Sequence, residues 1–250
     1  MRYNMEPIYR EEFKITTAAV DPFGRLKASW ILYYAQQVAG EHSSRLGINL
    51  ITPERELFWA VIRTRVQITR LPRKDEVITV ETWPMPTTRV AFPRCVTARD
   101  ADGNEVFRCI SLWVLMDRKS RAMVLPGKSG VDVQGLIRGD ELTAPGNLSV
   151  MTLSNHCSRH VGFSELDVNG HMNNTKYLDW SNDLLPSEFH RDHPVKEFTV
   201  CYLSEALEGQ QMDLTWELQD GPCVRVDAHR EHLTESNQKE RVFSALVMFE

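Results

Sequence analysis

The chain has 250 residues, 42% of them hydrophobic and 25% charged, which is the composition of a globular protein with a core of its own. Its formal net charge of −5 argues against a general nucleic-acid binder. The five cysteines include no Cys-x-x-Cys pair, and the sequence shows no metal-ligand spacing, so we expect reduced thiols and neither a metal nor another cofactor.

The N-terminus lacks the apolar segment of a secretory signal, and the chain starts directly at its first predicted strand. No apolar run approaches the length of a membrane span. We therefore expect a cytoplasmic protein without a transmembrane segment.

The first half of the chain predicts a strand, a helix and then a strand meander. Residues 10–20 predict the first strand, and Asp21-Pro22-Phe23-Gly24 predicts the turn into the helix. Apolar side chains recur on one face of this helix, and Gly47 suits the position just beyond its end. Asp102-Gly103 indicates a hairpin. Segments rich in β-branched and aromatic residues predict strands at 58–70, 77–85, 88–100 and 104–117.

Residues 121–150 contain several glycines and prolines and no sustained apolar period, which predicts a linker or an excursion from the fold. We expect an N-terminal unit over residues 1–125, a linker over 126–150 and a C-terminal unit over 151–250.

The second half repeats the order of the first. Asp167-Val168-Asn169-Gly170 has the spacing of the earlier Asp-x-x-Gly turn, and Trp180 follows Asp167 at the interval that separates Tyr34 from Asp21. Strands are predicted near 196–206, 210–218, 222–232 and 239–249. The duplication predicts an α+β chain of two units, each a helix packed on a curved antiparallel sheet. One irregular α+β domain with chance spacing is the alternative.

Polar side chains gather just before the second predicted helix. Asp167, Asn169, His171 and Asn173 occupy every second position, and Asn174 suits the N-cap. A helix N-terminus offers free backbone N–H groups to developing negative charge. A carboxylate, an amide and an imidazole are suited to positioning water and transferring protons.

Each of these residues also has an ordinary structural interpretation, because Asn169-Gly170 is a common turn and a single Asp or His is usually solvated. The combination is more specific than its members. The first unit has Phe23, Arg25 and Lys27 at the matching positions, so only the second unit carries the polar set.

The pattern resembles the acyl-acyl-carrier-protein (acyl-ACP) thioesterases, whose motif runs Asp-x-Asn-x-His-x-Asn-Asn-x-x-Tyr. That motif stands here at Asp167, Asn169, His171, Asn173, Asn174 and Tyr177. The resemblance extends through the first half, at Asp21, Gly24, Gln36-Gln37, Trp59, Val80-Glu81-Thr82-Trp83 and Trp113. It implies a tandem (double) hotdog fold and hydrolysis of the thioester between a fatty acyl chain and its carrier. Plant members carry a transit peptide, so the N-terminus of this chain looks bacterial.

The resemblance also implies a carboxylate on the strand after the second helix, in a Glu-Tyr-x-x-Glu-Cys pattern. Glu205 occupies the acidic position, and Ala206 stands where many plant relatives have cysteine. A Cys-His-Asn nucleophilic triad cannot form there, which favours direct attack by water held by Glu205 and Asn169. On sequence alone Glu205 could equally be a solvated strand residue. Cys201 lies an odd number of residues before Ala206, so we expect it to face the other way.

Further predictions concern the substrate. Apolar side chains for an acyl slot are expected in the first unit, with Asn173 and Asn174 also contacting substrate; the aromatic candidates are Trp30, Tyr33, Tyr34, Trp59 and Trp83. Most aromatic residues at such spacing simply form core. The acidic carrier protein is expected to dock on basic residues, in two clusters at Arg63, Arg65, Arg70, Arg73 and Lys74, and at Arg118, Lys119 and Arg121. Whether two chains form a homodimer stays open.

Three alternatives to an acyl-ACP thioesterase remain at this point. One is an acyl-CoA thioesterase of the same fold, and another is a dehydratase, which would release no free acid from a saturated thioester. The third is a non-catalytic protein that binds acyl chains or their carrier. The complete polar set of the second unit argues against the last, because a copy that had lost activity is expected to show gaps there.

Overall fold

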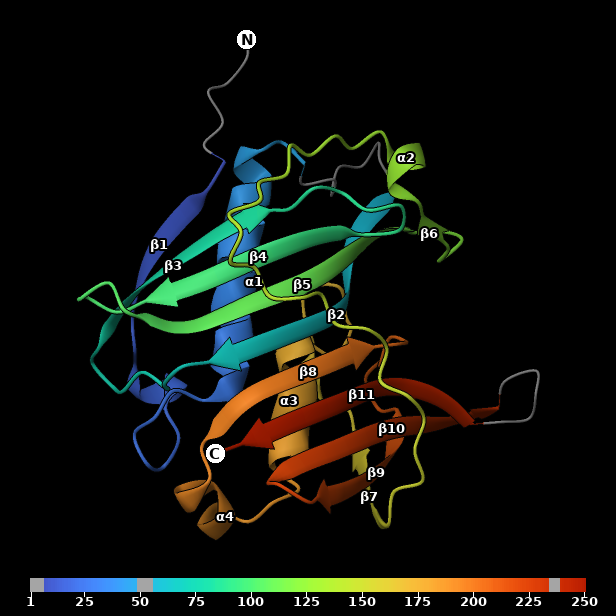
Figure 1. Cartoon of the computed structure of the whole chain (residues 1–250). Helices are drawn as coiled ribbons and strands as arrows, with labels where there is room; N and C mark the ends of the chain where they lie inside the picture. The colour runs from blue at the N-terminus through green and yellow to red at the C-terminus, as the bar shows by residue number, and fades with distance from the viewer. Residues whose placement is uncertain (1–6, 49–55, 234–238) are drawn as a thin grey trace. The chain divides into compact units, whose positions relative to one another are not determined.

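The computed structural model describes residues 7–48, 56–233 and 239–250. The chain divides into two compact units, Met1–Pro145 and Gly146–Glu250. Each unit combines one main helix with an antiparallel sheet, as Figure 1 shows. The predicted linker therefore contributes to both units.

The first unit is a sheet crossed on one face by a long helix, α1 (Ala28–Arg45) (Figure 1). Its strands lie in the order β1-β3-β4-β5-β2, and the short β6 pairs with β5. The bounds are β1 (Tyr9–Lys14), β2 (Leu57–Ile68), β3 (Val77–Pro84), β4 (Phe92–Arg99), β5 (Glu105–Asp117) and β6 (Met123–Val124), with a four-residue helix α2 (Pro126–Ser129) after β6.

The sequence of α1 explains how it packs. Ile31, Tyr34, Ala35 and Val38 recur at helical spacing and are all buried, as predicted. Burial of a large apolar side chain contributes about 1.5–3 kcal/mol, so this face fixes the helix on the sheet. Gly47 follows the C-cap with a φ of +67°, the left-handed conformation expected just beyond a helix end.

The second unit repeats the topology of the first. Its strands lie in the order β7-β9-β10-β11-β8. Counted along the chain, both units therefore place their first, third, fourth, fifth and second strands in that order across the sheet, leaving out the short β6. The main helix is α3 (Asn174–Asn182), followed by the short α4 (Ser187–Asp192). The strands are β7 (Asn155–His160), β8 (Val195–Tyr202), β9 (Gln211–Gln219), β10 (Cys223–Leu233) and β11 (Lys239–Phe249). The predicted duplication is confirmed.

Two local predictions were wrong. The strand predicted over residues 10–20 ends at Lys14, and a 3-10 helix, Thr17–Ala19, follows. The backbone N–H of Ala19 donates to the carbonyl of Thr16 there, which turns the chain towards α1. The strand predicted near 196–206 ends at Tyr202, so Glu205 and Ala206 lie beyond β8. The backbone N–H groups of Leu203 and Ser204 both donate to the carbonyl of Val242, which breaks the regular ladder there.

The first part of the predicted linker packs on the outer face of the first sheet. We call residues 131–145 the first strap. The backbone N–H of Leu136 donates to Pro84, and Leu136 and Leu142 pack against the buried cluster around Trp83. A Cβ on Gly135 would lie 2.0 Å from the backbone nitrogen of Pro86, so only glycine allows this approach.

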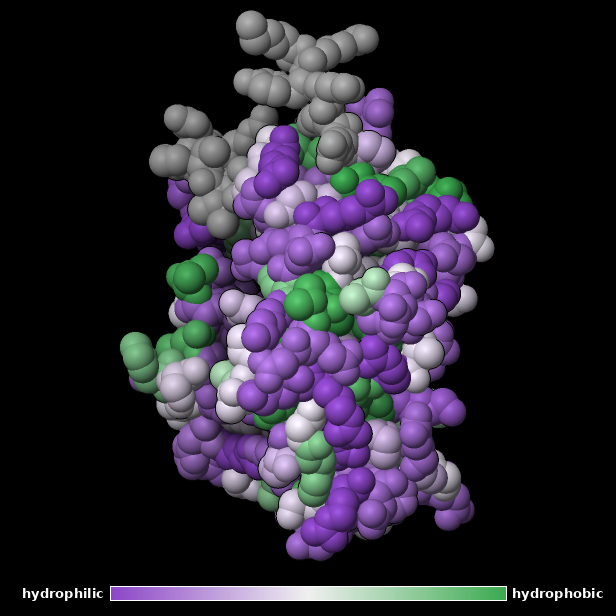
Figure 2. All heavy atoms as spheres, turned by 90° about the vertical axis from the view of Figure 1, so that its left-hand side faces the viewer, coloured by the Kyte–Doolittle hydropathy of each residue, from purple (hydrophilic) through white to green (hydrophobic). Residues whose placement is uncertain are grey.

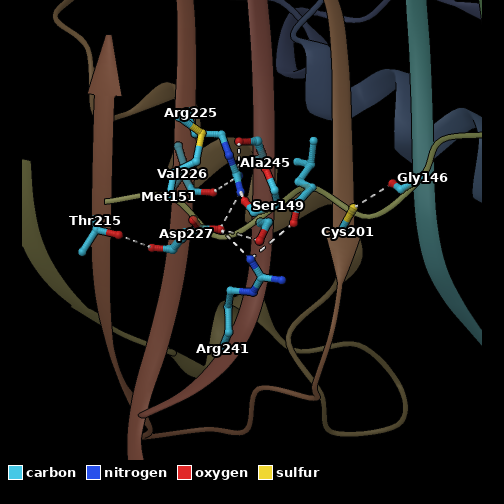
Figure 3. Close-up of polar contacts among 12 residues, drawn as sticks. Gly146, Ser149, Met151, Cys201, Thr215, Arg225, Val226, Asp227, Arg241 and Ala245 are labelled. Atoms are coloured by element: carbon cyan, nitrogen blue, oxygen red, sulfur yellow. Dashed lines mark hydrogen bonds and ion pairs between the residues drawn. The ribbon is translucent and has the colours of Figure 1, made fainter. Parts of the chain in front are cut away.

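The chain continues as a second strap, residues 146–151, on the outer face of the second sheet. Arg225 and Asp227, both buried, form an ion pair of 2.9 Å beneath it (Figure 3). Arg225 Nη2 also donates to the carbonyl of Ser149 at 2.9 Å, and Arg241 donates to that of Leu148 at 3.4 Å. Arginine side chains on the sheet therefore hold the strap by its backbone.

The surface shown in Figure 2 is largely hydrophilic, with small hydrophobic patches between polar side chains. Among the helices of the described ranges, none has both the length and the apolar character needed to cross a membrane.

Candidate active site

The polar set of the second unit lies on a tight turn that its own carboxylate organises. Asp167 Oδ1 accepts hydrogen bonds from the backbone N–H of Asn169 at 2.8 Å and of His171 at 3.2 Å. The carbonyl of Asp167 accepts from Gly170, whose φ of +77° confirms the predicted turn. One oxygen of Asp167 is thus committed to backbone structure.

The first unit contains the same turn without the polar set. Asp21 Oδ1 accepts from the backbone N–H of Phe23 at 2.8 Å and of Arg25 at 2.9 Å, and Gly24 has a φ of +75°. Because this aspartate builds the turn where the motif's Asn and His are missing, turn formation alone accounts for an acid at this position.

His171 and Glu205 face each other across two segments of the second unit. The His171 Nε2 to Glu205 Oε2 distance is 3.6 Å, somewhat longer than a direct hydrogen bond. The His171 side chain is 20% exposed and that of Glu205 is 40% exposed, so water reaches both. An imidazole and a carboxylate at this distance can both hydrogen-bond one water molecule and transfer its protons.

Backbone contacts fix the segment that carries Glu205 beside the turn. The N–H of Met172 donates to the carbonyl of Ala206 at 2.8 Å, and His171 forms a β-bridge with Leu207. The two chemical groups are therefore positioned by paired backbone rather than by side chains alone.

A single arginine also holds this segment from the sheet. Arg230 of β10 donates from Nη1 to the carbonyl of Glu205 at 2.8 Å and from Nη2 to Ser204 Oγ at 2.8 Å. Glu240 of β11 accepts from Arg230 Nε at 2.8 Å and keeps the guanidinium in place. Nothing in the sequence marks Arg230 for this role, because it is remote from the motif.

Helix α3 begins one residue earlier than the sequence suggested. Asn173, not Asn174, is the N-cap, and its Oδ1 accepts from the backbone N–H of Thr175 at 3.0 Å. Asn174 is the first helical residue, and its backbone N–H has no hydrogen-bond acceptor among the described residues. That amide, at the positive end of the helix, is a free donor beside His171.

Tyr177 anchors the first turn of α3 in the core. Its ring packs edge-on against Tyr202 at 5.4 Å and Phe243 at 4.9 Å. Burial raises the pKa of Tyr177, although a hydrogen bond from the backbone of Ala206 opposes the shift. The phenol therefore stays neutral and serves as a structural anchor for the site.

The first unit contains a cavity of about 250 Å³ between α1 and the sheet. Gln36 and the small residues Ala39, Gly40 and Ser43 form its helix side, and a Cβ on Gly40 would meet nothing within 4 Å. The sheet side is mostly apolar and includes Trp59, Pro84, Phe92, Arg94 and Trp113. Its apolar walls suit an alkyl chain.

The aromatic candidates for the acyl slot separate into three groups. Trp59 lines the cavity and packs edge-on against Phe92 at 4.9 Å. Trp30, Tyr33 and Tyr34 instead contact one another, with ring centroids 5.0–5.8 Å apart, and they are not among the residues of the cavity wall. Trp83 is buried beneath the first strap.

The two basic clusters are partly neutralised by neighbouring acids. Arg70 pairs with Glu76 at 2.8 Å and with Asp100 at 2.9 Å, and Lys119 pairs with Glu56. Such exposed pairs contribute little to stability, but they reduce the positive field that each cluster presents.

Comparison with known proteins follows the same division of the chain. The acyl-ACP thioesterase N-terminal domain matches residues 6–125, and the acyl-ACP thioesterase C-terminal domain matches residues 150–244. The chain belongs to the acyl-ACP thioesterase family.

Relatives of this acyl-ACP thioesterase family member include plant enzymes. The chain is 26% identical over 217 residues to a chloroplastic dodecanoyl-[acyl-carrier-protein] hydrolase from Cinnamomum camphora, covering 79% of this chain and 56% of that protein. It is 24% identical to a chloroplastic palmitoyl-acyl carrier protein thioesterase from Gossypium hirsutum, covering 79% and 52%. The chain thus spans about half the length of the curated relatives it matches.

Solved structures confirm the fold. An acyl-ACP thioesterase from Bacteroides thetaiotaomicron superimposes with a TM-score of 0.86 at 23% identity, covering 98% of both chains. The 12:0-ACP thioesterase from Umbellularia californica gives a TM-score of 0.82 at 23% identity, again covering 98% of both. The predicted double hotdog fold is therefore correct.

Proposed function

We propose that this protein hydrolyses fatty acyl-ACP thioesters to free fatty acid and ACP. The observation that carries the proposal is the His171–Glu205 pair beside the α3 N-terminus, on a chain of the acyl-ACP thioesterase family. The pair supplies a general base and a proton carrier, and the helix N-terminus supplies a backbone donor; water-mediated thioester hydrolysis requires these groups.

The chemistry needs no covalent enzyme intermediate. Glu205 removes a proton from water, and the water oxygen bonds to the thioester carbonyl carbon while that carbonyl oxygen becomes an oxyanion. The free N–H of Asn174 stabilises the oxyanion. Collapse then breaks the C–S bond, and the sulfur leaves with the proton that Glu205 had taken. His171 and Asn169 orient the water and the thioester.

We assign the cavity of the first unit to the acyl chain, because its walls are largely apolar. The carrier protein is the proposed partner, docking through basic side chains such as Arg118, which is exposed. A cytoplasmic location stays a prediction, and the question of a homodimer stays open.

The direct test offers the purified protein a matched pair of substrates, dodecanoyl-ACP and dodecanoyl-CoA, and measures released free acid. We expect higher kcat/KM for the ACP thioester. Equal or better turnover of the CoA thioester would favour the acyl-CoA alternative, and binding without release of acid would favour the non-catalytic one.

We expect hydrolysis to proceed without any cysteine. Burial raises the pKa of the Cys95 thiol to about 12 and also raises the pKa of Cys157 and Cys223, which disfavours the nucleophilic thiolate. Cys201 is 1% exposed and lies 3.7 Å from the carbonyl of Gly146, under the second strap (Figure 3). Single Cys→Ala variants should keep turnover within about threefold of wild type. An acyl-enzyme trapped on Cys201 and found by mass spectrometry would overturn this.

We expect the helix side of the cavity to control acyl length. Gly40→Leu should fill the space next to Ala39 and shift the preferred chain towards shorter acyl groups, because each methylene in an apolar slot changes discrimination by about 1–3 kcal/mol. The measurement is kcat/KM across a series of saturated acyl-ACPs. Tyr33→Leu is the matched control, because Tyr33 is 48% exposed and outside the cavity wall. An unchanged length profile in Gly40→Leu would place the acyl chain elsewhere.

A further inference from the structure

The cavity wall contains a buried arginine that the hydrolysis described above does not use. Arg94 of β4 is 6% exposed, and its Nη1 donates to Thr82 Oγ1 at 3.2 Å and contacts His42 Nδ1 at 3.1 Å. Nη2 lies 3.4 Å from Ser43 Oγ. A guanidinium can only donate, so His42 Nδ1 must accept, and all three partners are neutral acceptors.

The charge of Arg94 therefore has no carboxylate partner in the described parts of the chain. Burial lowers the pKa of Arg94 to about 10; the neighbouring Cys95 opposes the shift, but no carboxylate does. The other deeply buried arginine, Arg225, is different, because it pairs with Asp227 at 2.9 Å and donates to backbone carbonyls. This protein thus pairs one buried arginine with a carboxylate and leaves the other with spare donors.

Those spare donors belong to a side chain of the cavity wall. A guanidinium has five N–H donors, and Arg94 has three acceptors, one of them at the limit of hydrogen-bond distance. Trp59, Phe92 and Trp113 make the rest of the sheet side apolar. A plain alkyl chain would fill this space without supplying an acceptor, whereas a chain with an oxygen atom would complete the arginine's hydrogen bonding.

We propose that the cavity selects acyl groups that carry an acceptor oxygen along the chain, as an oxo, hydroxyl or carboxyl group, and that Arg94 binds this oxygen. The inference rests on the proposed assignment of the cavity to the acyl chain. Arg94 is then a specificity-determining residue, because a site built to hydrogen-bond a substrate discriminates against the analogue that lacks the polar group.

Binding of small probes tests the ligand class without turnover. 1-Octanol and 1-octanethiol have nearly the same shape, but the thiol is a much weaker acceptor. Binding is followed by the fluorescence of Trp59 and Trp113 in the cavity wall. We expect 1-octanol to bind wild type about tenfold more tightly than 1-octanethiol, the size of one well-placed hydrogen bond.

Variants identify the residue responsible. Arg94→Met should remove or reverse the preference for octanol, and Arg94→Lys, which keeps the charge with fewer donors, should keep part of it. Arg99→Met is the matched control, because Arg99 lies on the same strand and donates to Gly103 in the hairpin instead. Equal binding of the two probes by wild type, or an octanol preference that survives Arg94→Met, overturns the proposal. The wild-type comparison decides even if Arg94→Met does not fold.

Turnover separates the three oxygen groups and the two proposals. Wild type is given acyl-ACPs of equal length whose chains end in a methyl, hydroxyl, oxo or carboxyl group. We expect at least one oxygenated chain to be hydrolysed with about tenfold higher kcat/KM than the plain chain, and Arg94→Met to lose that advantage. Faster hydrolysis of the plain chain than of all the oxygenated chains contradicts the role of Arg94 while leaving the thioesterase function intact. Failure to hydrolyse any of them contradicts the thioesterase function instead.

Discussion

Glu205→Gln is expected to lower turnover of acyl-ACP by about 10²–10⁴-fold, the usual size of a general acid–base contribution. The amide keeps the shape of the side chain but cannot accept a proton from water. The backbone of Glu205 is held by Arg230 and its neighbour Ala206 by Met172, so the fold should stay intact. Circular dichroism checks the fold, and single-turnover hydrolysis measures the chemical step apart from substrate binding, which should change little.

The companion variant Asp167→Asn decides which carboxylate is the base. In the wild type, Asp167 Oδ1 accepts hydrogen bonds from two backbone N–H groups, and an asparagine side chain can preserve both of them. Asp21 accepts the equivalent two backbone hydrogen bonds in the first unit, where the motif's Asn and His are missing. We therefore expect a smaller loss than in Glu205→Gln and an altered pH–rate profile only in the latter. Full activity in Glu205→Gln with none in Asp167→Asn would make Asp167 the base.

His171→Ala and Asn169→Ala are each expected to lower the rate strongly, by about 10²-fold or more. His171 Nε2 lies 3.6 Å from Glu205 Oε2, and His171 and Asn169 both belong to the turn that leads into α3. Only their backbone N–H groups are needed by Asp167, so alanine should leave the turn in place. The measurement is again single-turnover hydrolysis on protein whose fold has been checked.

The duplicated fold supplies matched controls for these two variants. Phe23 and Arg25 occupy the corresponding positions of the first turn. Phe23→Ala and Arg25→Ala should retain most of the activity, because that turn lacks the Asn and His of the motif. Near-wild-type rates in both His171→Ala and Asn169→Ala would remove the second turn from the catalytic site.

Enrichment in β-branched and aromatic residues predicted most of the strands, because such side chains suit a pleated, half-buried sheet. It located the meander in both units and, with the repeated Asp-x-x-Gly spacing, the duplication itself. The sequence did not locate the start of α3, because two neighbouring residues have the same propensity for the N-cap. Asn173 and Asn174 are equally good N-caps in sequence, and only the hydrogen bond to Thr175 distinguishes them. The strand that begins at Tyr9 is shorter than predicted, because the 3-10 helix Thr17–Ala19 turns the chain towards α1.

The motif located the candidate chemical groups, but the cavity could not be found in the same way. Its volume depends on small helix residues such as Gly40 lying opposite aromatic side chains of distant strands. Nothing local in the sequence marks that meeting. An arginine within the strand sequence Phe92-Pro93-Arg94 was the one available signal, since charge in a buried strand calls for a partner. Trp30, Tyr33 and Tyr34 satisfied the expected composition but contact one another instead.

The second strap is attached almost entirely through its main chain. Its backbone carbonyls at Gly146, Ser149 and Leu148 accept hydrogen bonds from the side chains of Cys201, Arg225 and Arg241, respectively. Every amino acid has such a carbonyl group. Substitutions along residues 146–151 can therefore accumulate over evolution while the attachment persists. A change in the number of residues is different, because it would move each carbonyl away from the side chain that donates to it. Homologous chains should accordingly differ in amino-acid identity across this segment but keep its length.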